Sequence, residues 1–149
     1  MAKTACIGHV HIKVSDLKKA EKFYAETLGL KVTERVHGKY VFLTFGEKHH
    51  DVALQQVDDA IKQPGNSVGL YHFAIELDSS KGLAEIYKKL KDASVPMTPI
   101  DHGISKVIYF SDPDGNGIEV YIDTRHVRKF WKGISEPLDM EKSASHPKN

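Results

Sequence analysis

Apolar and polar residues alternate in two short runs of the chain, VHIKV at 10–14 and FAIEL at 73–77. This two-residue period predicts strands that bury one face, because successive side chains on a strand point to opposite sides. A histidine precedes each run, His9 before the first and His72 before the second. The two histidines are 63 positions apart (72 − 9 = 63). With the same offset, the segment HVHIKVSDLKKAEKFYAETLG, which begins at His9, aligns with HFAIELDSSKGLAEIYKKLKD, which begins at His72. The chain therefore contains an internal repeat.

A helix is predicted after each of these strands, because apolar residues recur there at helical spacing. The expected buried stripes are Leu17, Ala20, Tyr24 and Leu28 in the first copy, and Leu83, Ile86, Tyr87 and Leu90 in the second. Either Ser15 or Asp16 is the expected N-cap of the first helix, and Gly29 its stop. Ser79 or Ser80 is expected to cap the second helix.

Shorter apolar segments beyond each helix predict further strands. They lie near 32–35, 40–45 and 51–56 in the first copy, and near 97–100, 106–110 and 118–122 in the second. Each copy thus has the order βαβββ, which predicts an α+β fold whose two βαβββ modules form an open mixed sheet enclosing a cavity.

The modules are expected at about 5–58 and 69–125, joined by the polar linker DDAIKQPGNSVG. Together they are interpreted as one domain over 1–125. Residues 126–149 form a C-terminal extension, in which HVRKFW could pack back on the domain through its aromatic residues. The last residues of this extension are expected to be disordered.

Composition narrows the class of protein. A length of 149 residues, 40% hydrophobic and 28% charged, is typical of one globular domain. The net charge of +1 predicts no nucleic-acid or membrane partner. Cys6 is the single cysteine, which excludes an intrachain disulfide and favours a cytoplasmic location, and no run of about 20 apolar residues predicts a membrane span. Nine histidines stand out.

Strand parity places three potential metal ligands on the same kind of surface. If the alternating apolar residues face the helices, His9 and His72 face the opposite side, as does Glu119 on the final strand. Two imidazoles and one carboxylate are the facial triad that holds a divalent metal, typically Fe(II), and leaves positions open for reactants. Each residue alone is more often an ordinary surface group, and His11 shares the parity of His9.

The segments IGHVHIKVSDLKKAEKFYAETLGL, GLYHFAIEL and YFSDPDGNGIEVYID resemble the vicinal oxygen chelate superfamily, over about residues 7–123. Within it, the chain resembles the type I extradiol dioxygenases such as catechol 2,3-dioxygenase. This resemblance implies a glyoxalase/bleomycin resistance/dihydroxybiphenyl dioxygenase-like fold. The segments HDVAL, DHG and VIYF, at 50–54, 101–103 and 107–110, sharpen this resemblance. Many members have two such domains, and this sequence has one.

The resemblance implies a set of site residues. His9, His72 and Glu119 would bind Fe(II), although the same ligands also suit Mn(II), and His9 is preferred over His11 because the family's ligand follows IG. His50, His102 and Tyr109 would act on substrate and oxygen, whereas His49 is interpreted as a solvated loop residue. The implied reaction is ring opening of a catechol by O2 to a 2-hydroxymuconic semialdehyde, in aromatic hydrocarbon catabolism.

Two other functions fit the same framework. A metal-dependent thiol transferase or glyoxalase-like lyase would share the metal without needing His50 and His102. Glyoxalase-type sites take a fourth ligand from the first module, where the repeat offset places Gln56 (119 − 63 = 56) rather than an acid. A drug-binding module would hold no metal. Homodimers or larger homo-oligomers are expected, because open sheets leave edges that need cover.

Overall fold

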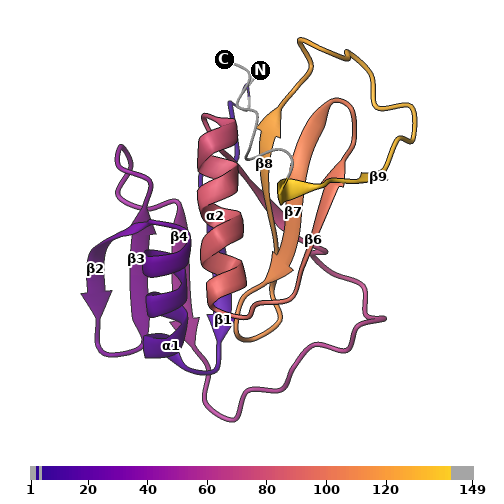
Figure 1. The fold of residues 1–149 in the computed structure, drawn as a ribbon. Coiled ribbons are helices and arrows are strands. Elements are labelled where there is room, and N and C mark those ends of the chain that lie inside the picture. Colours follow the sequence, from indigo (N-terminus) through magenta and orange to yellow (C-terminus); the bar gives the residue numbers. More distant parts are fainter. Residues whose placement is uncertain (1–2, 4, 142–149) are drawn as a thin grey trace. The chain divides into compact units, whose positions relative to one another are not determined.

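The computed structural model describes residue 3 and residues 5–141, and the chain forms two compact units, Met1–Ser67 and Val68–Asn149 (Figure 1). The first unit contains β1 (Val10–Val14), α1 (Leu17–Lys22), the π-helical turn η1 (Phe23–Thr27), β2 (Lys31–Val36), β3 (Tyr40–Thr44) and β4 (Val52–Gln56). The second contains β5 (Phe73–Glu76), α2 (Ser80–Asp92), β6 (Met97–Asp101), β7 (Ser105–Ser111), β8 (Gly117–Asp123) and β9 (Glu136–Pro137). The predicted α+β class and the βαβββ order of each half are confirmed.

The first sheet has the order β1-β4-β3-β2, with β1 parallel to β4 and the other pairs antiparallel. The helix α1 lies on the face of this sheet over β3 and β4. Asp16 is the N-cap, and its carboxylate accepts a hydrogen bond of 3.0 Å from the backbone N–H of Lys19. Gly29 ends the helical segment with a φ of 77°, a conformation that favours glycine.

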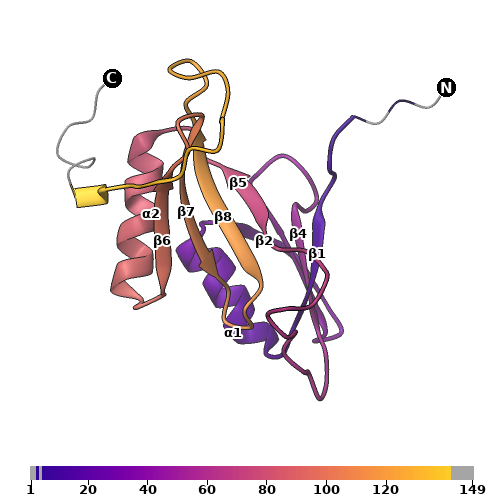
Figure 2. The ribbon, with the colours of Figure 1, turned by 90° about the vertical axis from the view of Figure 1, so that its right-hand side faces the viewer.

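The second sheet has the order β5-β8-β7-β6-β9 (Figure 2), with β5 parallel to β8 and the remaining neighbours antiparallel. Its helix α2 lies against β7 and β8, and Ser79 caps it by accepting a hydrogen bond from the Gly82 N–H. The equivalent pairing of β1 with β4 and of β5 with β8 shows that the sequence repeat is also a structural repeat.

The predicted strand faces are confirmed by burial. On β8, Ile118, Val120 and Ile122 are buried and the residues between them are half-exposed. The helical stripes are confirmed in part. In the first, Thr27 is buried and Leu28 is only half-buried at the C-cap, just beyond the end of the helical segment, and in the second, Tyr87 is only half-buried.

Two features of the extension are new. Residues 136–137 form β9 on the edge of β6, and Met140 is buried, so this segment continues the second unit beyond Arg125. The predicted disorder of the last residues falls on 142–149, outside the described residues. Among the described residues, no helix has the length and apolar content needed to cross a bilayer.

Candidate functional site

In the first unit, the loop before β4 brings two predicted site residues together. His9 precedes β1 and His50 precedes β4, and their ring centroids are 4.5 Å apart. The parallel pairing of Val10 with Val52 explains this contact, because it aligns the segments that enter both strands. Phe42 on β3 lies beside the His50 ring, at 5.0 Å between centroids. His11 lies farther along β1, with its ring 6.3 Å from that of Tyr40.

Local hydrogen bonds hold the loop between β3 and β4. The Asp51 carboxylate accepts from the Thr44 hydroxyl at 3.0 Å and from the Phe45 N–H at 2.9 Å. The Lys48 ammonium group donates to the Gly8 carbonyl at 3.3 Å, directly before His9. The position of His50 beside His9 is thus set by contacts at both ends of this loop.

His49 is exposed, as predicted, but it is not merely solvated. Its Nε2 atom lies 3.1 Å from Glu34 Oε2, and its Nδ1 atom lies 2.9 Å from His50 Nδ1. A carboxylate accepts, so in neutral rings Nε2 of His49 carries a proton and its Nδ1 accepts from His50. Residue periodicity does not predict the contact with Glu34, whose position follows from a register shift between Val32 and Glu34 in the pairing of β2 with β3.

The pKa of His50 is lowered from its ordinary value. Burial is the largest cause, followed by the positive charges that His9 and His49 would carry when protonated. His50 is therefore neutral near pH 7. With Nδ1 donating to His49, its Nε2 atom has a free lone pair that can accept a proton.

In the second unit, strand register places two predicted site residues side by side. Glu119 on β8 pairs with Ala74 on β5 and with Tyr109 on β7, so Tyr109 and Glu119 share a face. His72 precedes β5 by one residue, and its Nε2 atom lies 2.9 Å from Glu119 Oε2. The His72 ring is also 5.3 Å from the Tyr109 ring. The sequence repeat predicted this face, and the sheet pairing brings the groups into contact.

His72 and Glu119 form a close ion pair or hydrogen bond through atoms of the types that can bind a metal. Two donors bound at right angles to one cation, each at about 2.1 Å, are about 3.0 Å apart. The observed 2.9 Å between Nε2 and Oε2 is the distance of an ordinary hydrogen bond and is also close to this spacing. Among the described residues, His72 Nδ1 is also the one buried side-chain nitrogen or oxygen atom without a hydrogen-bond partner. An imidazole and a carboxylate with this spacing fit a divalent cation.

Among the described residues, no three His, Cys, Asp or Glu side chains are arranged to hold one metal ion. Of the three predicted ligands, His9 lies in the first unit and His72 and Glu119 lie in the second, and their binding of one common ion stays a prediction.

His102 and Tyr109 form a hydrogen-bonded pair. Nε2 of His102, which follows β6, lies 2.9 Å from the Tyr109 hydroxyl, and Nδ1 lies 2.8 Å from the Ile134 carbonyl. Burial, with a further contribution from the Glu119 carboxylate, raises the pKa of Tyr109 to about 12. Tyr109 therefore keeps its proton at neutral pH and is a hydrogen-bond donor.

The strand pairings correct one residue correspondence. On β8, Glu119 pairs with Ala74, and the repeat offset of 63 makes Ala74 equivalent to His11 on β1 (74 − 63 = 11). His11 pairs with Ala53, so the residue that corresponds to Glu119 is Ala53 rather than Gln56. The offset changes because the connections differ in length. The expectation of no acidic fourth ligand on this strand is kept, since Ala53 has no donor side chain.

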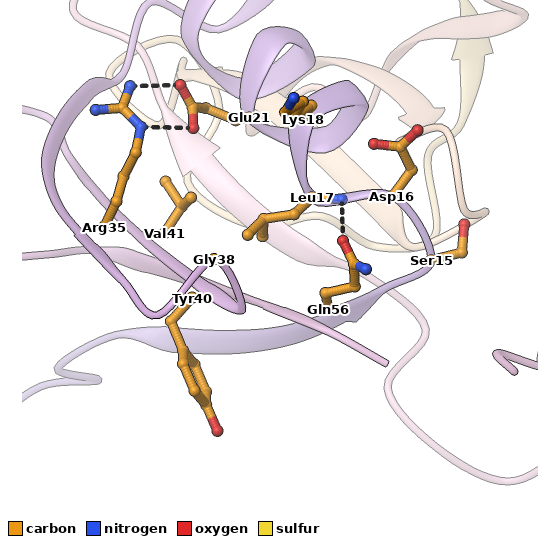
Figure 3. A pocket seen from close by; sticks show the side chains of 10 residues that line it. All are labelled: Ser15, Asp16, Leu17, Lys18, Glu21, Arg35, Gly38, Tyr40, Val41 and Gln56. Atoms are coloured by element: carbon orange, nitrogen blue, oxygen red, sulfur yellow. Dashed lines mark hydrogen bonds and ion pairs between the residues drawn. The ribbon is translucent and has the colours of Figure 1, made fainter. Parts of the chain in front are cut away.

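Gln56 has a structural role instead. Its side-chain oxygen accepts a hydrogen bond of 3.1 Å from the Leu17 N–H at the start of α1 (Figure 3). It also lines an open cavity of about 600 Å³ on the helix side of the first sheet. Arg35 and Glu21 form a two-point ion pair at its edge (Figure 3). This cavity contains none of the predicted site residues.

The chain is similar in sequence and fold to known proteins. The chain is 35% identical over 126 residues to biphenyl-2,3-diol 1,2-dioxygenase 2 of Rhodococcus globerulus, with 83% of the chain and 65% of the relative covered. It is 35% identical over 127 residues to catechol-2,3-dioxygenase of Bacillus subtilis, with 85% of the chain and 44% of the relative covered. The chain thus spans less than two thirds of either relative.

The fold is similar to that of a solved lactoylglutathione lyase from Agrobacterium tumefaciens, with a TM-score of 0.63 and 23% identity. This match covers 81% of the chain and 96% of that structure. The sequence model of the Glyoxalase/Bleomycin resistance protein/Dioxygenase superfamily matches residues 6–120, which include His9, His72 and Glu119. The chain therefore belongs to the glyoxalase/bleomycin resistance protein/dioxygenase superfamily.

Proposed function

We propose that the protein is an extradiol dioxygenase that opens a catechol with O2 to a 2-hydroxymuconic semialdehyde. In this proposal His9, His72 and Glu119 hold Fe(II), and the same ligands also suit Mn(II). The 2.9 Å spacing of His72 Nε2 and Glu119 Oε2, next to Tyr109, is the observation that carries it. The 35% identity to two dioxygenases that act on aromatic diols supports the choice of reaction.

The metal, when bound, would lower the pKa of the catechol hydroxyls and hold both reactants in adjacent positions. His50 is suited to acid–base work, because its lowered pKa keeps the ring neutral with Nε2 free to take a proton. It would accept a proton from the substrate and return it to the reduced oxygen.

Tyr109 and His102 would orient the substrate. The raised pKa of Tyr109 keeps its hydroxyl protonated, and with that proton directed at Nε2 of His102, the Tyr109 oxygen can accept a hydrogen bond from a substrate hydroxyl. His102 holds that hydroxyl through the 2.9 Å contact at Nε2. Their proximity to Glu119 would place both groups beside a catechol bound there.

The first substrates to test are catechols without a carboxylate substituent. The chain has three arginines, and two of them are engaged in ion pairs, Arg35 with Glu21 and Arg125 with Asp123. A carboxylate is commonly bound by a two-point arginine contact, so plain, alkylated and chlorinated catechols are tested before carboxylated ones.

The test is anaerobic loading with Fe(II), followed by catechols in air, with the yellow ring-opened product measured by absorbance and both oxygen atoms of O2 traced into it by isotope labelling. Manganese loading in parallel identifies the working metal. Failure of both loaded forms to open any catechol would contradict the proposal.

The alternative is a metal-dependent thiol transferase or glyoxalase-like lyase. The fold similarity to a lactoylglutathione lyase keeps this alternative open, whereas Ala53 at the fourth-ligand position favours the dioxygenase. The same loaded protein, given the hemithioacetal of methylglyoxal and glutathione, should form no lactoylglutathione. A drug-binding module would show no stoichiometric metal at all.

A further inference from the structure

The C-terminal segment, residues 126–137, is anchored to the second sheet at both ends. At its start, the N–H groups of Val127 and Arg128 donate to the Thr124 carbonyl, at 2.8 and 3.2 Å. At its end, β9 pairs with β6, and the Leu138 N–H donates to the Pro99 carbonyl at 3.1 Å. The segment lies beyond residues 6–120, the part matched by the superfamily.

Between these anchors, the segment closes around His102. Nδ1 of His102 lies 2.8 Å from the Ile134 carbonyl and 3.1 Å from the Ser135 hydroxyl. The Trp131 ring meets the imidazole edge-on, at 5.9 Å between centroids and 86° between planes. The Trp131 indole N–H donates to the same Ile134 carbonyl, which fixes the position of that oxygen.

Side chains of the C-terminal segment also pack closely against Gly103, the residue after His102. Gly103 has a φ of 76°, and a Cβ atom there would lie 2.7 Å from Cδ of Arg128. The Gly103 carbonyl accepts a hydrogen bond of 3.0 Å from the Thr124 hydroxyl. The turn that contains His102 and Gly103 therefore contacts Thr124, just before the C-terminal segment, and Arg128, within it.

This geometry determines which ring nitrogen carries the proton. The Ile134 carbonyl oxygen only accepts and is the nearer of the two partners of Nδ1, so it favours the neutral ring with the proton on Nδ1, and the Ser135 hydroxyl can then accept from the same N–H. Nε2 then has the lone pair and accepts a hydrogen bond from the Tyr109 hydroxyl. In the opposite tautomer the lone pair of Nδ1 would face the lone pairs of the Ile134 carbonyl oxygen at 2.8 Å, although the Tyr109 oxygen could accept from Nε2–H.

We propose that the C-terminal segment is a positioning element of the site. Ile134 and Trp131 select the His102 tautomer with the proton on Nδ1, and thereby direct the Tyr109 hydroxyl. The catalytic importance of this positioning rests on the proposed function. The assignment of the His102 tautomer does not depend on the proposed function, so the tautomer and the function can be tested separately.

The test is a long-range 1H–15N NMR spectrum of the imidazoles in the full, metal-free chain, with His102 assigned through His102→Gln. The wild type is expected to show one His102 tautomer, protonated on Nδ1. Trp131→Ala releases the Ile134 carbonyl, so His102 should show averaged signals from both tautomers. Phe130→Ala is the matched control, because Phe130 is a neighbouring aromatic residue that is 62% exposed, and it should leave the spectrum unchanged.

A chain that stops after Arg125 should behave like Trp131→Ala, and a chain that stops after Glu141 should behave like the wild type. If the shorter chain does not fold, Trp131→Ala decides. In the iron-loaded enzyme, Trp131→Ala should lower kcat by about 10–100-fold, as loss of outer partners that orient a histidine does, while bound iron is retained.

A wild-type His102 protonated on Nε2, or an unchanged tautomer in Trp131→Ala, would overturn the proposal. If loaded wild type opens no catechol while its metal-free spectrum shows the Nδ1-protonated ring, the proposed function fails and the positioning of His102 is supported. These results separate failure of the two proposals.

Discussion

The proposed site residues of the two units differ in their contacts, and these contacts suit them to different roles, metal binding or proton transfer. His72 and Glu119 contact each other through potential donor atoms, whereas His50 contacts another histidine and an aromatic ring. Metal affinity depends on the donor atoms themselves, and proton transfer depends on the pKa and the free lone pair of the ring. Substitutions should separate these two roles.

Replacing a proposed ligand should remove the metal and leave the fold intact. His72→Ala removes an imidazole donor, so the protein should bind less than one equivalent of iron and lose ring-opening activity, with an unchanged circular dichroism spectrum. Elemental analysis after Fe(II) loading measures the effect. His126→Ala, at an exposed histidine, is the control and should retain the metal. A full equivalent of iron in His72→Ala would exclude His72 as a ligand.

Substitution of the adjacent histidines should give graded losses. His50→Phe should lower turnover by about 10²–10⁴, the usual range for an acid–base group, with iron content unchanged. His49 contacts His50 through Nδ1 and is itself bonded to Glu34, so His49→Phe should cause a smaller loss. Steady-state kinetics with catechol measures both.

A larger loss in His49→Phe than in His50→Phe would reverse the assignment of the two rings. Loss of iron in His50→Phe would instead make His50 a ligand.

At the scale of elements, tight contact between segments positions the proposed ligands. Gly117 begins β8, and a Cβ atom there would lie 2.2 Å from the Tyr71 carbonyl and 3.2 Å from Cβ of His72. Only glycine lets the strand that carries Glu119 approach the segment that carries His72 this closely. The 2.9 Å His72–Glu119 contact thus depends on backbone packing two residues away.

The substitution Gly117→Ala should disturb stability and metal binding together. The added methyl group meets backbone, which cannot rotate away, so the free energy of unfolding should fall by about 1–3 kcal/mol. His72 should be displaced from Glu119, and iron affinity should fall. Urea unfolding and iron titration measure the two effects.

Gly65→Ala is the control, because a Cβ atom at Gly65 meets nothing within 4 Å. Full stability and full iron affinity in Gly117→Ala would show that the strand can shift without effect on the site.

At the scale of the whole molecule, two similar units each present sheet edges. Among the described strands, β2 pairs only with β3, and its residues 31–36 are mostly exposed. An uncovered strand edge favours pairing with another chain, and natural proteins cover or interrupt such edges. Assembly is therefore expected from the fold as well as from its two-unit organisation.

We predict at least a homodimer. Light scattering coupled to size-exclusion chromatography should give at least twice the chain mass of 16.7 kDa, across a range of protein concentrations. Arg35 and Glu21 pair beside β2, so Arg35→Glu places two like charges there and should weaken a dimer built on that edge. A mass equal to one chain at every concentration would contradict the prediction of a dimer.

The sequence by itself determined the repeat, the strand faces and the class of the fold. Alternation over a few residues is a local property, so it placed Glu119 and Tyr109 on strands and Ile118, Val120 and Ile122 in the core. It also determined that His9 and His72 occupy equivalent positions before the first strand of each unit, because the repeat offset of 63 holds there.

Only the tertiary structure decided the contacts that depend on loop length and strand register. It replaced Gln56 by Ala53 as the counterpart of Glu119, because the last connections of the two units differ in length. A register shift in β2 brought Glu34 to His49, and the C-terminal segment brought Ile134 to His102. Such contacts join segments far apart in the chain, and residue periodicity carries no information about how those segments meet.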